Sequence, residues 1–369
     1  MKVLCVIDNL STGGAQRQII NLAIGLHQRG HYVSMFFYAP GTLLAQYLEK
    51  EGVHVHVQLK KSRYSFNVIK GLRRCIDQGK YRAIVSFLNT PNFYAVLSSC
   101  LSRTRPAVIV SERSFDLPGY PNSIELAIRQ SYRFSRKIIV NSHHQRKNFV
   151  RRYPWMGKRV VTIYNGYDLQ EFVPLSCEPE NTQLNIMVIA SVSRYRNGLC
   201  LVRALDILRK QYGLLPRVSW AGQRVMHGDR LKYLLAMEYE IKHFGLSEQW
   251  EWLDQRTDII NLLYQHDVLV HPSYGEGLPN VVCEAMACGR PVIISNTLDH
   301  PYLVRDGVNG FLFDWRDPGD LARKLKAFYD LSGYERHRMG AMGRDFAEKN
   351  LSLERYVRDF EQILSRVVK

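Results

Sequence analysis

Short runs rich in valine and isoleucine recur through both halves of the chain, and helical stretches separate them. The runs lie at residues 2–7, 32–38, 54–59, 83–88, 107–111, 137–142 and 160–166, and then at 185–192, 217–222, 250–253, 268–273 and 291–295. Strands that alternate with helices and carry near-continuous apolar runs are typical of parallel sheets covered by helices on both faces. The sequence therefore predicts an α/β fold with two doubly wound, Rossmann-like domains facing across a cleft.

The division of the chain into domains follows from its length and from one proline-containing stretch. A chain of 369 residues is too long for one hydrophobic core and suits two domains. Residues 173–183 contain two prolines and little hydrophobic periodicity, as expected of a linker. We predict a first domain over 1–172 and a second over 173–352. The segment 353–369 has apolar residues at helical spacing, which predicts an amphipathic helix able to pack back on the first domain.

The composition excludes several classes of protein. A hydrophobic content of 46% with 23% charged residues is that of a soluble globular protein. No apolar run approaches the roughly 18 to 20 residues that span a bilayer, and the first residues are too soon followed by Asp8 for a signal peptide. Seven cysteines without a CxxC pair indicate free thiols in a reducing cytoplasm and argue against a zinc site.

The excess positive charge lies entirely in the first half of the chain. Residues 1–172 hold 25 lysines and arginines against 9 acidic residues, whereas residues 173–369 hold 25 of each. The densest basic segments are 60–75 and 143–159. Such a surface suits an anionic partner, which could be lipid headgroups, a lipid-linked pyrophosphate or nucleic acid. A solvated basic surface that only keeps the protein in solution is the alternative.

The stretch GEGLPNVVCEAMACG, residues 275–289, carries the strongest functional signal. It follows an apolar strand, and Pro279 suits the first turn of a helix that Gly289 can end in a left-handed conformation. Glycines at 275 and 277 let the backbone approach a ligand, and the helix start, with the N–H groups of Leu278 and Asn280, can bind a phosphate. Glu276 and Glu284 could then hold hydroxyls on either side of that phosphate. Two glutamates at this spacing alone would more often be ordinary surface residues, but the glycines, the proline and the preceding strand favour the site.

The segment HPSYGEGLPNVVCEAMACGRPVIISNTLDHPYLVRDGVNGFLF resembles the carboxyl-terminal signature of the family-4 glycosyltransferases, and the resemblance extends over nearly the whole chain. These are retaining enzymes of the glycosyltransferase-B architecture. The resemblance implies that Glu276, Gly277, Leu278, Asn280 and Glu284 bind a nucleotide-sugar donor. It implies no cofactor, because the nucleotide-sugar is a substrate.

Two further loops fit this family. Gly13 and Gly14 stand between the first strand and a helix, where the family usually has a GGxE loop beside the donor phosphates, and Gln16 replaces the glutamate. After the first strand of the second domain, Arg194 matches the arginine that binds the donor diphosphate in relatives. Arg196 precedes Asn-Gly as the family lysine does, in a loop that looks shortened. We take Arg194, Arg196 and Glu276 as the catalytic group.

The resemblance also places the nucleobase and the crossing between domains. Relatives often hold the base through backbone groups near the positions of Asp254 to Arg256, so Arg256 is included among the donor-binding residues. The stretch TIYNGYDLQEF resembles the family's NGxD crossing, although Asn165-Gly166 is also simply a good turn.

The acceptor side is predicted from strand ends in the first domain. Asn89 follows one apolar run, and Glu112 and Arg113 follow the next. With Gln16, these residues are our acceptor-side candidates, and a salt-bridged or capping role for Glu112 is equally open. The histidines that follow Ser142, which we expect to cap a helix, belong with the basic surface.

Sugar transfer from a nucleotide requires stabilisation of the departing diphosphate, which arginines and a helix start can supply. The chain has no DxD triplet, so we predict no essential metal. The family's amino-terminal domain generally binds the acceptor, and many acceptors are lipid-linked saccharides. We therefore expect a peripheral enzyme on the cytoplasmic face of the membrane. It would bind an anionic inner-membrane surface and extend a lipid-linked saccharide for a surface polysaccharide such as lipopolysaccharide.

Other functions remain to be separated by experiment. A nucleotide-sugar epimerase or hydrolase of the same architecture would bind a similar donor without an acceptor. A basic nucleic-acid-binding protein is less consistent with the sequence, because half of the chain is neutral and no binding motif is present, so no nucleic-acid partner is expected. The sequence does not specify the base, the donor sugar or the linkage. UDP-hexose or UDP-N-acetylhexosamine is the default expectation for the donor.

Overall fold

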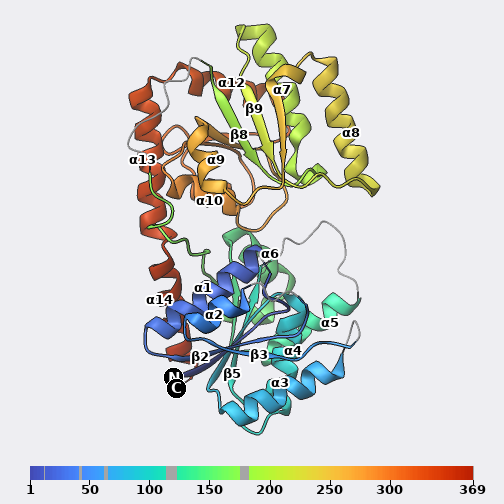
Figure 1. Ribbon diagram of the computed structural model, residues 1–369, viewed down its shortest axis with the longest axis vertical. Coiled ribbons are helices and arrows are strands. Elements are labelled where there is room, and N and C mark those ends of the chain that lie inside the picture. The colour runs from blue at the N-terminus through green and yellow to red at the C-terminus, as the bar shows by residue number, and fades with distance from the viewer. Residues whose placement is uncertain (12, 41–43, 62–64, 114–122, 175–182, 369) are drawn as a thin grey trace. The chain divides into compact units, whose positions relative to one another are not determined.

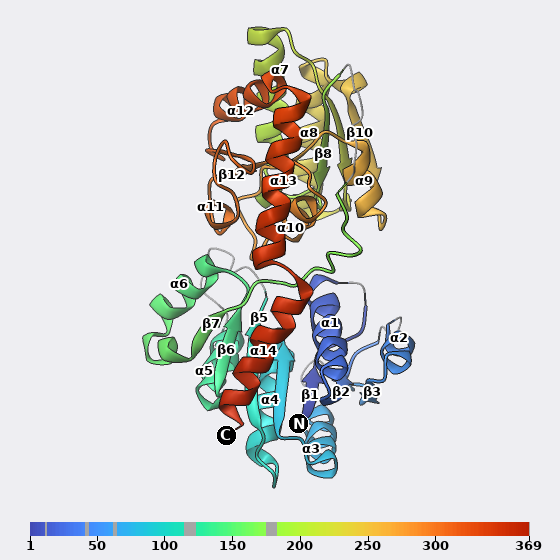
Figure 2. The same ribbon diagram turned by 90° about the vertical axis from the view of Figure 1, so that its left-hand side faces the viewer.

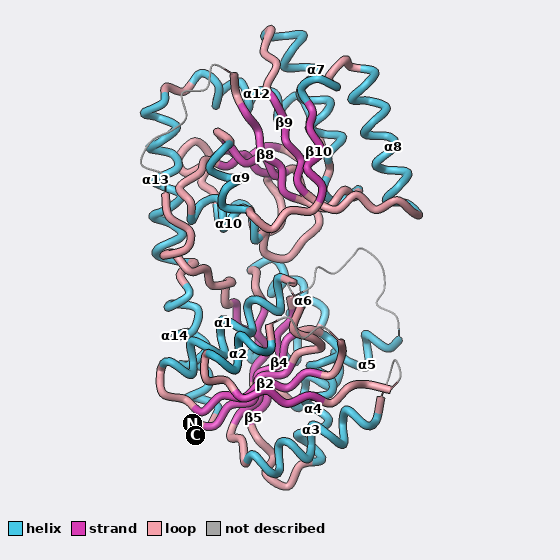
Figure 3. Tube along the Cα trace, viewed as in Figure 1, coloured by secondary structure: helices cyan, strands magenta, loops and turns pink. Residues whose placement is uncertain are grey.

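The computed structural model describes residues 1–11, 13–40, 44–61, 65–113, 123–174 and 183–368. The chain divides into two compact units, and each is described by itself. Unit 1 contains residues 1–166 together with 353–369, and unit 2 contains residues 167–352. Both units are parallel sheets with helices on their faces (Figures 1 and 3), so the predicted α/β architecture is confirmed.

Unit 1 is built on a seven-stranded parallel sheet in the order β3-β2-β1-β4-β5-β6-β7. Its strands are β1 (Lys2–Val6), β2 (Tyr32–Phe37), β3 (His54–Val57), β4 (Ala83–Phe87), β5 (Ala107–Glu112), β6 (Lys137–Val140) and β7 (Val160–Thr162). Its helices are α1 (Gly14–Gln28), α2 (Ala45–Lys50), α3 (Phe66–Gly79), α4 (Asn89–Leu101), α5 (Ser123–Ser131), α6 (His143–Arg152) and α14 (Leu353–Val367), with the 3-10 turns η1 (Tyr132–Phe134) and η2 (Pro154–Arg159).

The side chains of β1 show why this sheet needs helices on both faces. Val3 and Cys5 belong to the cluster that α1 and α14 cover, whereas Leu4 and Val6 belong to the cluster that α3 and α4 cover. Successive side chains of a strand point to opposite faces, so an unbroken apolar run buries both. The near-continuous Val/Ile pattern seen in the sequence is the direct cause of the layered arrangement.

Unit 2 repeats this plan with a six-stranded parallel sheet in the order β10-β9-β8-β11-β12-β13. Its strands are β8 (Asn185–Ile189), β9 (Arg217–Ala221), β10 (Trp250–Asp254), β11 (Val268–His271), β12 (Val292–Ser295) and β13 (Phe311–Phe313). Its helices are α7 (Gly198–Tyr212), α8 (Gly228–His243), α9 (Ile259–Gln265), α10 (Asn280–Ala287), α11 (His300–Leu303), α12 (Pro318–Asp330) and α13 (Gly333–Asn350), with the 3-10 turns η3 (Arg194–Arg196) and η4 (Ser247–Gln249).

Every strand predicted from the sequence is present, and within the described residues one further strand was not predicted. The missed strand, β13, is three residues long and pairs with β12 at the edge of the sheet. A run of three residues is too short to show a period in the sequence. Because β13 lies at an edge, its omission does not change the placement of the loops that follow the central strands.

Strand order identifies where each unit can bind a ligand. In unit 2 the order reverses between β8 and β11, which lie side by side. In open α/β sheets, ligands bind beyond the carboxyl ends of the strands at such a reversal. The loop after β8 contains Arg194 and Arg196, and the loop after β11 contains Glu276. In unit 1 the reversal lies between β1 and β4, which are followed by the loop of Gly13 and by Asn89 at the start of α4.

The carboxyl-terminal helix α14 completes the core of unit 1. Its residues Tyr356, Val357 and Phe360 are buried in the cluster that also contains the apolar face of α1. Figure 2 shows α14 running beside α1 in this unit. A Cβ added at Gly25 of α1 would lie 2.4 Å from Cγ2 of Val357. The absence of a side chain at Gly25 therefore allows the two helices to approach closely.

Replacing Gly25 with alanine tests this close approach. We expect the free energy of unfolding to fall by about 1–3 kcal/mol, the usual cost of overpacking, although alanine favours helix more than glycine does. Adding Val357→Ala removes the opposing methyl groups. The loss in the free energy of unfolding of the double variant should therefore be smaller than the sum of the two single losses by at least about 0.5 kcal/mol. Denaturant unfolding measures both effects.

Gly333→Ala is a suitable control, because a Cβ at the first residue of α13 meets no atom within 4 Å. Additive effects of Gly25→Ala and Val357→Ala would show that α14 is not seated against Gly25 in solution.

Candidate functional site

His271 at the end of β11, the loop from Pro272 to Pro279 and the helix α10 form the core of the candidate site. Val281, Val282, Ala285 and Met286 are buried and hold α10 against the sheet and against α13. Gly289 has a φ of +66°, which confirms the predicted left-handed end of this helix. The helix begins at Asn280 with Pro279 as its N-cap, one residue later than predicted. Its amino terminus thus lies directly after the loop that carries Glu276.

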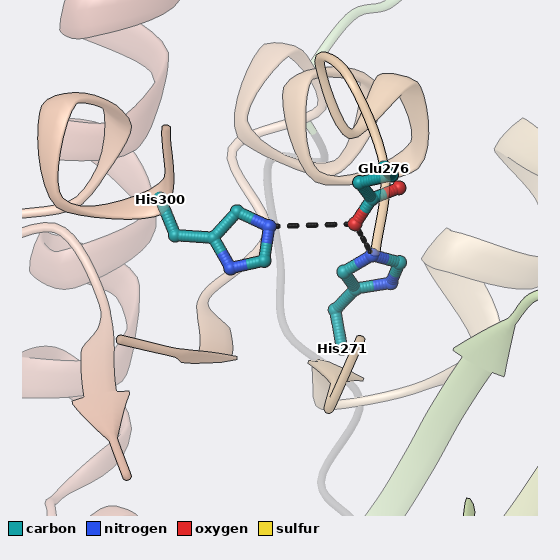
Figure 4. A group of neighbouring side chains, drawn as sticks. All are labelled: His271, Glu276 and His300. Carbon is teal, nitrogen blue, oxygen red and sulfur yellow. Dashed lines mark hydrogen bonds and ion pairs between the residues drawn. The ribbon is translucent and has the colours of Figure 1, made fainter. Parts of the chain in front are cut away.

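Glu276 is surrounded by hydrogen-bond donors (Figure 4). Its Oε1 lies 2.5 Å from Nε2 of His271 and 3.3 Å from Nε2 of His300. Its Oε2 accepts a hydrogen bond from Nη1 of Arg196 at 2.5 Å. The Glu276 side chain is only 9% exposed. Both carboxylate oxygens are therefore engaged, one by two imidazoles and the other by a guanidinium.

Hydrogen bonds identify the tautomer of His271. Nδ1 of His300 lies 2.7 Å from the carbonyl oxygen of Ser295 and 3.0 Å from its hydroxyl oxygen. His271 is buried, and its Nδ1 has no hydrogen-bond partner among the described residues. Since the carboxylate of Glu276 can only accept, Nε2 of His271 carries the proton that the pair shares. Glu276 thus fixes His271 as its Nε2–H form.

The ionisation of this group follows from opposing effects. Burial disfavours the charged form of Glu276, but its interactions with His271 and Arg196 and the hydrogen bond from His300 outweigh burial. The pKa of Glu276 consequently lies well below its ordinary value. Burial lowers the pKa of His271 by more than the nearby carboxylate raises it. At neutral pH the pair is therefore an ionised carboxylate and a neutral imidazole.

The two arginines after β8 differ in their surroundings. They belong to η3, and Asn197, which follows, has a φ of +56° that asparagine tolerates well. Arg196 turns toward the loop after β11, where it also donates to Oγ of Ser273 at 3.1 Å. Arg194 is exposed, and its side chain makes no hydrogen bond or ion pair within the described ranges. The structure brings Arg196, but not Arg194, into contact with Glu276.

The other residues predicted to bind the donor lie outside the group that Glu276 forms with His271, His300 and Arg196. Arg256 forms an ion pair with Asp258 at 2.5 Å on the exposed side of the loop after β10. Asn280 accepts a hydrogen bond from the Tyr167 hydroxyl at 2.8 Å, and Leu278 is buried. Glu284 lies half-buried inside α10. Gly277 is half-exposed between Glu276 and the helix. The donor contacts assigned to these residues stay predictions.

In unit 1 the predicted GG loop is found between β1 and α1. Gly13 is the N-cap of α1 and Gly14 its first residue. A Cβ at Gly13 would lie 2.3 Å from Oε1 of Gln16, so any larger residue there would displace the Gln16 amide. Gln16 is buried, and its Nε2 donates to Asp8 at 3.1 Å. The carboxylate of Asp8, which accepts this hydrogen bond from Gln16, would repel a glutamate at position 16.

Of the predicted acceptor-side residues of unit 1, Asn89 and Glu112 contact each other, whereas Arg113 contacts other residues. Glu112 is 1% exposed. It accepts a hydrogen bond from the Tyr132 hydroxyl and two from the amide of Asn89, at 2.8 and 2.9 Å when that amide is oriented to donate. Arg113 donates to Asn165 and lies over the ring of Phe87 at 4.2 Å. The carboxylate of Glu112 is thus engaged within the fold, and acceptor contacts of these residues remain untested.

Ser142 caps α6, as predicted, by accepting a hydrogen bond from the backbone N–H of Gln145. His143 therefore begins a helix on the basic segment.

A metal ion is one alternative occupant of the group around Glu276. Ligand atoms of His271, Glu276 and His300 lie within 4.8 Å of one another, and imidazole with carboxylate suits transition metals. However, Arg196 places a permanent positive charge 2.5 Å from Oε2 of the same carboxylate. That charge opposes a second cation, so the arrangement favours a hydrogen-bonded network over a metal site.

His271 and His300 were not predicted from the sequence as site residues. His271 lies inside an apolar strand and reads as a core residue, and His300 lies 29 positions later with no characteristic spacing. The sheet brings them together because β11 and β12 are neighbours, with His271 opposite Ile294. The only usable signal was a histidine at the carboxyl end of a strand that precedes the glutamate loop.

Comparisons with known proteins place the chain in a family. A family model described as "Glycosyltransferase Family 4" matches residues 12–171, and one described as "Glycosyl transferases group 1" matches residues 183–330. The D-inositol 3-phosphate glycosyltransferase of Mycolicibacterium vanbaalenii is 28% identical over 206 residues, 51% of this chain and 44% of the relative. That of Thermobifida fusca is 29% identical over 218 residues, 56% of this chain and 50% of the relative. The matches thus span about half the length of these curated relatives or less.

Solved structures resemble the chain over its whole length. Anabaena Alr3699/HepE in complex with UDP has a TM-score of 0.84 at 20% identity, covering 99% of this chain and 100% of that one. A glycosyltransferase from Rickettsia africae has a TM-score of 0.85 at 19% identity, covering 100% and 98%. At these identities the likeness shows the fold, which is that of the glycosyltransferase-B enzymes. With the two family models covering most of both halves, the chain belongs to family 4 of the glycosyltransferases.

Proposed function

We propose that this protein is a retaining glycosyltransferase that moves a sugar from a nucleotide-sugar, UDP-hexose or UDP-N-acetylhexosamine, to a lipid-linked saccharide in surface polysaccharide biosynthesis. The observation that carries the proposal is the ionised Glu276 beside Arg196, at the point where strand order reverses and α10 begins. The structurally similar Anabaena Alr3699/HepE, solved in complex with UDP and with UDP-glucose, supports a uridine donor.

The chemistry assigns separate tasks to these groups. As the bond between sugar and diphosphate breaks, negative charge develops on the leaving oxygen. Arg194, Arg196 and the amino terminus of α10 supply positive potential for it. Glu276 accepts hydrogen bonds from sugar hydroxyls and orients the ring, while the acceptor hydroxyl is held on the face that the diphosphate leaves. Glu276 acts in this scheme as a positioning group for the sugar rather than as a nucleophile.

Replacing Glu276 with alanine should separate donor binding from transfer. We expect binding of the nucleoside diphosphate to stay measurable and transfer to fall by about 10²–10³-fold, as when an active-site hydrogen-bonding group is lost. A thermal-shift panel of UDP-, GDP- and ADP-sugars first identifies the donor. Product analysis with the acceptor then measures transfer, and Glu248→Ala, at an exposed position of unit 2, is the control.

Wild-type turnover in Glu276→Ala would remove this residue from the site. Release of free sugar or formation of an isomer from the donor alone, without acceptor, would favour the hydrolase or epimerase alternative.

Removal of metal ions tests the prediction of a metal-independent reaction. Because Arg196 and the start of α10 can bind the diphosphate, transfer should be unchanged within about twofold after EDTA treatment and desalting. A loss of activity that Mn²⁺, Mg²⁺ or Zn²⁺ restores would show that a cation is required. The same assay on His300→Gln would then show whether the group around Glu276 holds it.

The surface of unit 1 supports the membrane part of the proposal. Phe66, 78% exposed, begins α3 in the basic segment 60–75, and Trp155, 62% exposed, lies in η2 within the basic segment 143–159. Exposed aromatic residues among lysines and arginines suit the interface of an anionic bilayer. Among the described residues, no helix has the length and apolarity needed to cross a membrane.

Flotation with vesicles that contain anionic lipid tests this surface. The protein should float at low salt and should be released as ionic strength rises, since screening weakens the attraction. Phe66→Ser and Trp155→Ser should each reduce flotation several-fold, whereas Tyr239→Ser, at a side chain 69% exposed in the neutral half, should not. No association with anionic vesicles at low salt would exclude the membrane surface as a partner.

A further inference from the structure

Arg196 and Glu276 are assigned to different parts of the donor, yet they bind each other. Nη1 of Arg196 lies 2.5 Å from Oε2 of Glu276, and the same nitrogen donates to Ser273. In the proposed function, Arg196 serves the diphosphate and Glu276 serves the sugar. A carboxylate in contact with the guanidinium repels incoming phosphate oxygens, and Arg196 takes up one of the acceptor positions of Oε2. Separation of the pair would turn the guanidinium to the diphosphate and open that acceptor position to a sugar hydroxyl.

The two oxygens of Glu276 are held in different ways. Oε1 contacts His271 and His300, whose side chains are buried, and His300 is itself fixed by Ser295. Within the described part of the chain, Oε2 contacts only Arg196, whose side chain is 27% exposed and projects from the short turn η3. When the ion pair breaks, the histidines keep the carboxylate in place and Arg196 is the partner that moves. Glu276 thus has one anchored oxygen and one exchangeable oxygen.

We propose that Arg196 and Glu276 form an exchangeable ion pair, called here the donor lock, in which the incoming diphosphate takes Arg196 from Glu276 and thereby opens Oε2 to a sugar hydroxyl. This inference rests on the proposed function and extends it. His271 and His300 are positioning residues, since they act through Glu276. No covalent step is involved, because one pair of charge-assisted hydrogen bonds replaces another.

The donor lock has a consequence for product release. A complete nucleotide-sugar breaks the ion pair and then satisfies both partners, the diphosphate at Arg196 and a hydroxyl at Oε2. A nucleoside diphosphate breaks the same pair but leaves Oε2 without a partner, which is costly for a buried carboxylate. Because donor and product both break the ion pair, the lock weakens the binding of both, and the bond from a sugar hydroxyl to Oε2 is what favours the donor over the product. Re-pairing of Arg196 with Glu276 assists release of the product.

Binding of UDP to four proteins tests the lock, with GDP and ADP titrated in parallel. The proteins are the wild type, Glu276→Gln, Arg196→Ala and the double variant, each as the full chain and checked by thermal melting. Glutamine can still accept from His271 but carries no charge for Arg196. We expect Glu276→Gln to bind UDP more tightly than the wild type, on the order of tenfold, the scale of one charge-assisted hydrogen bond. In the Arg196→Ala background the same change should have no effect.

The outcomes distinguish the lock from its alternatives. An equal gain from Glu276→Gln in both backgrounds would indicate general repulsion by the carboxylate and would overturn the exchange. Tight binding of UDP with no gain in Glu276→Gln would overturn the lock while leaving the proposed function intact. Failure of UDP, GDP and ADP to bind the wild type would overturn both.

The anchoring role of His271 needs a readout beyond stability. His271→Leu should lower the ratio of UDP-sugar affinity to UDP affinity several-fold, because an unanchored carboxylate can follow Arg196 instead of meeting the sugar. His271→Gln keeps an N–H donor and should restore most of that ratio. Equal ratios in the wild type and both folded variants would show that His271 is only a packing residue.

Discussion

A single buried carboxylate that is kept ionised determines the arrangement of the candidate site. Taking Glu276 out of water is costly, and nothing in an apolar core would offset that cost. The fold offsets it with donors from separate elements: His271 at the end of β11, His300 at the start of α11, and Arg196 in the turn after β8. The order β8-β11-β12 in the sheet brings the loops that follow these strands together. Residues from all of these loops thus stabilise the same charge, that of the Glu276 carboxylate.

The fold could be predicted from the sequence further than the site could. The apolar runs predicted the strands because each run is long enough to show its composition, and only the run of β13, three residues between Gly310 and Asp314, was too short. The glycines and the proline around Glu276 predicted a strand–loop–helix because those residues have narrow backbone preferences. Local sequence is sufficient for features of this kind.

The partners of Glu276 depend on tertiary structure, and local sequence does not specify them. His271 and His300 are far apart in the chain, and neither stands in a pattern that separates a ligand from a core residue. Glu112 illustrates the opposite case. Its place after a strand suggested the acceptor side, but the structure engages its carboxylate with Tyr132 and Asn89 inside unit 1. A strand end fixes where the backbone goes, and packing decides which way the side chain turns.

The buried ionic group also argues for function on energetic grounds. A buried ion pair with its hydrogen bonds is seldom more stabilising than apolar residues of similar volume, because desolvation offsets the Coulombic gain. Stability alone would therefore not require Glu276, two histidines and Arg196 to be assembled at the end of a central strand. Where buried ionic groups replace apolar packing, a functional site is expected. The partly exposed guanidinium is the one member of this group that can change partner, which places any exchange with a ligand at Arg196.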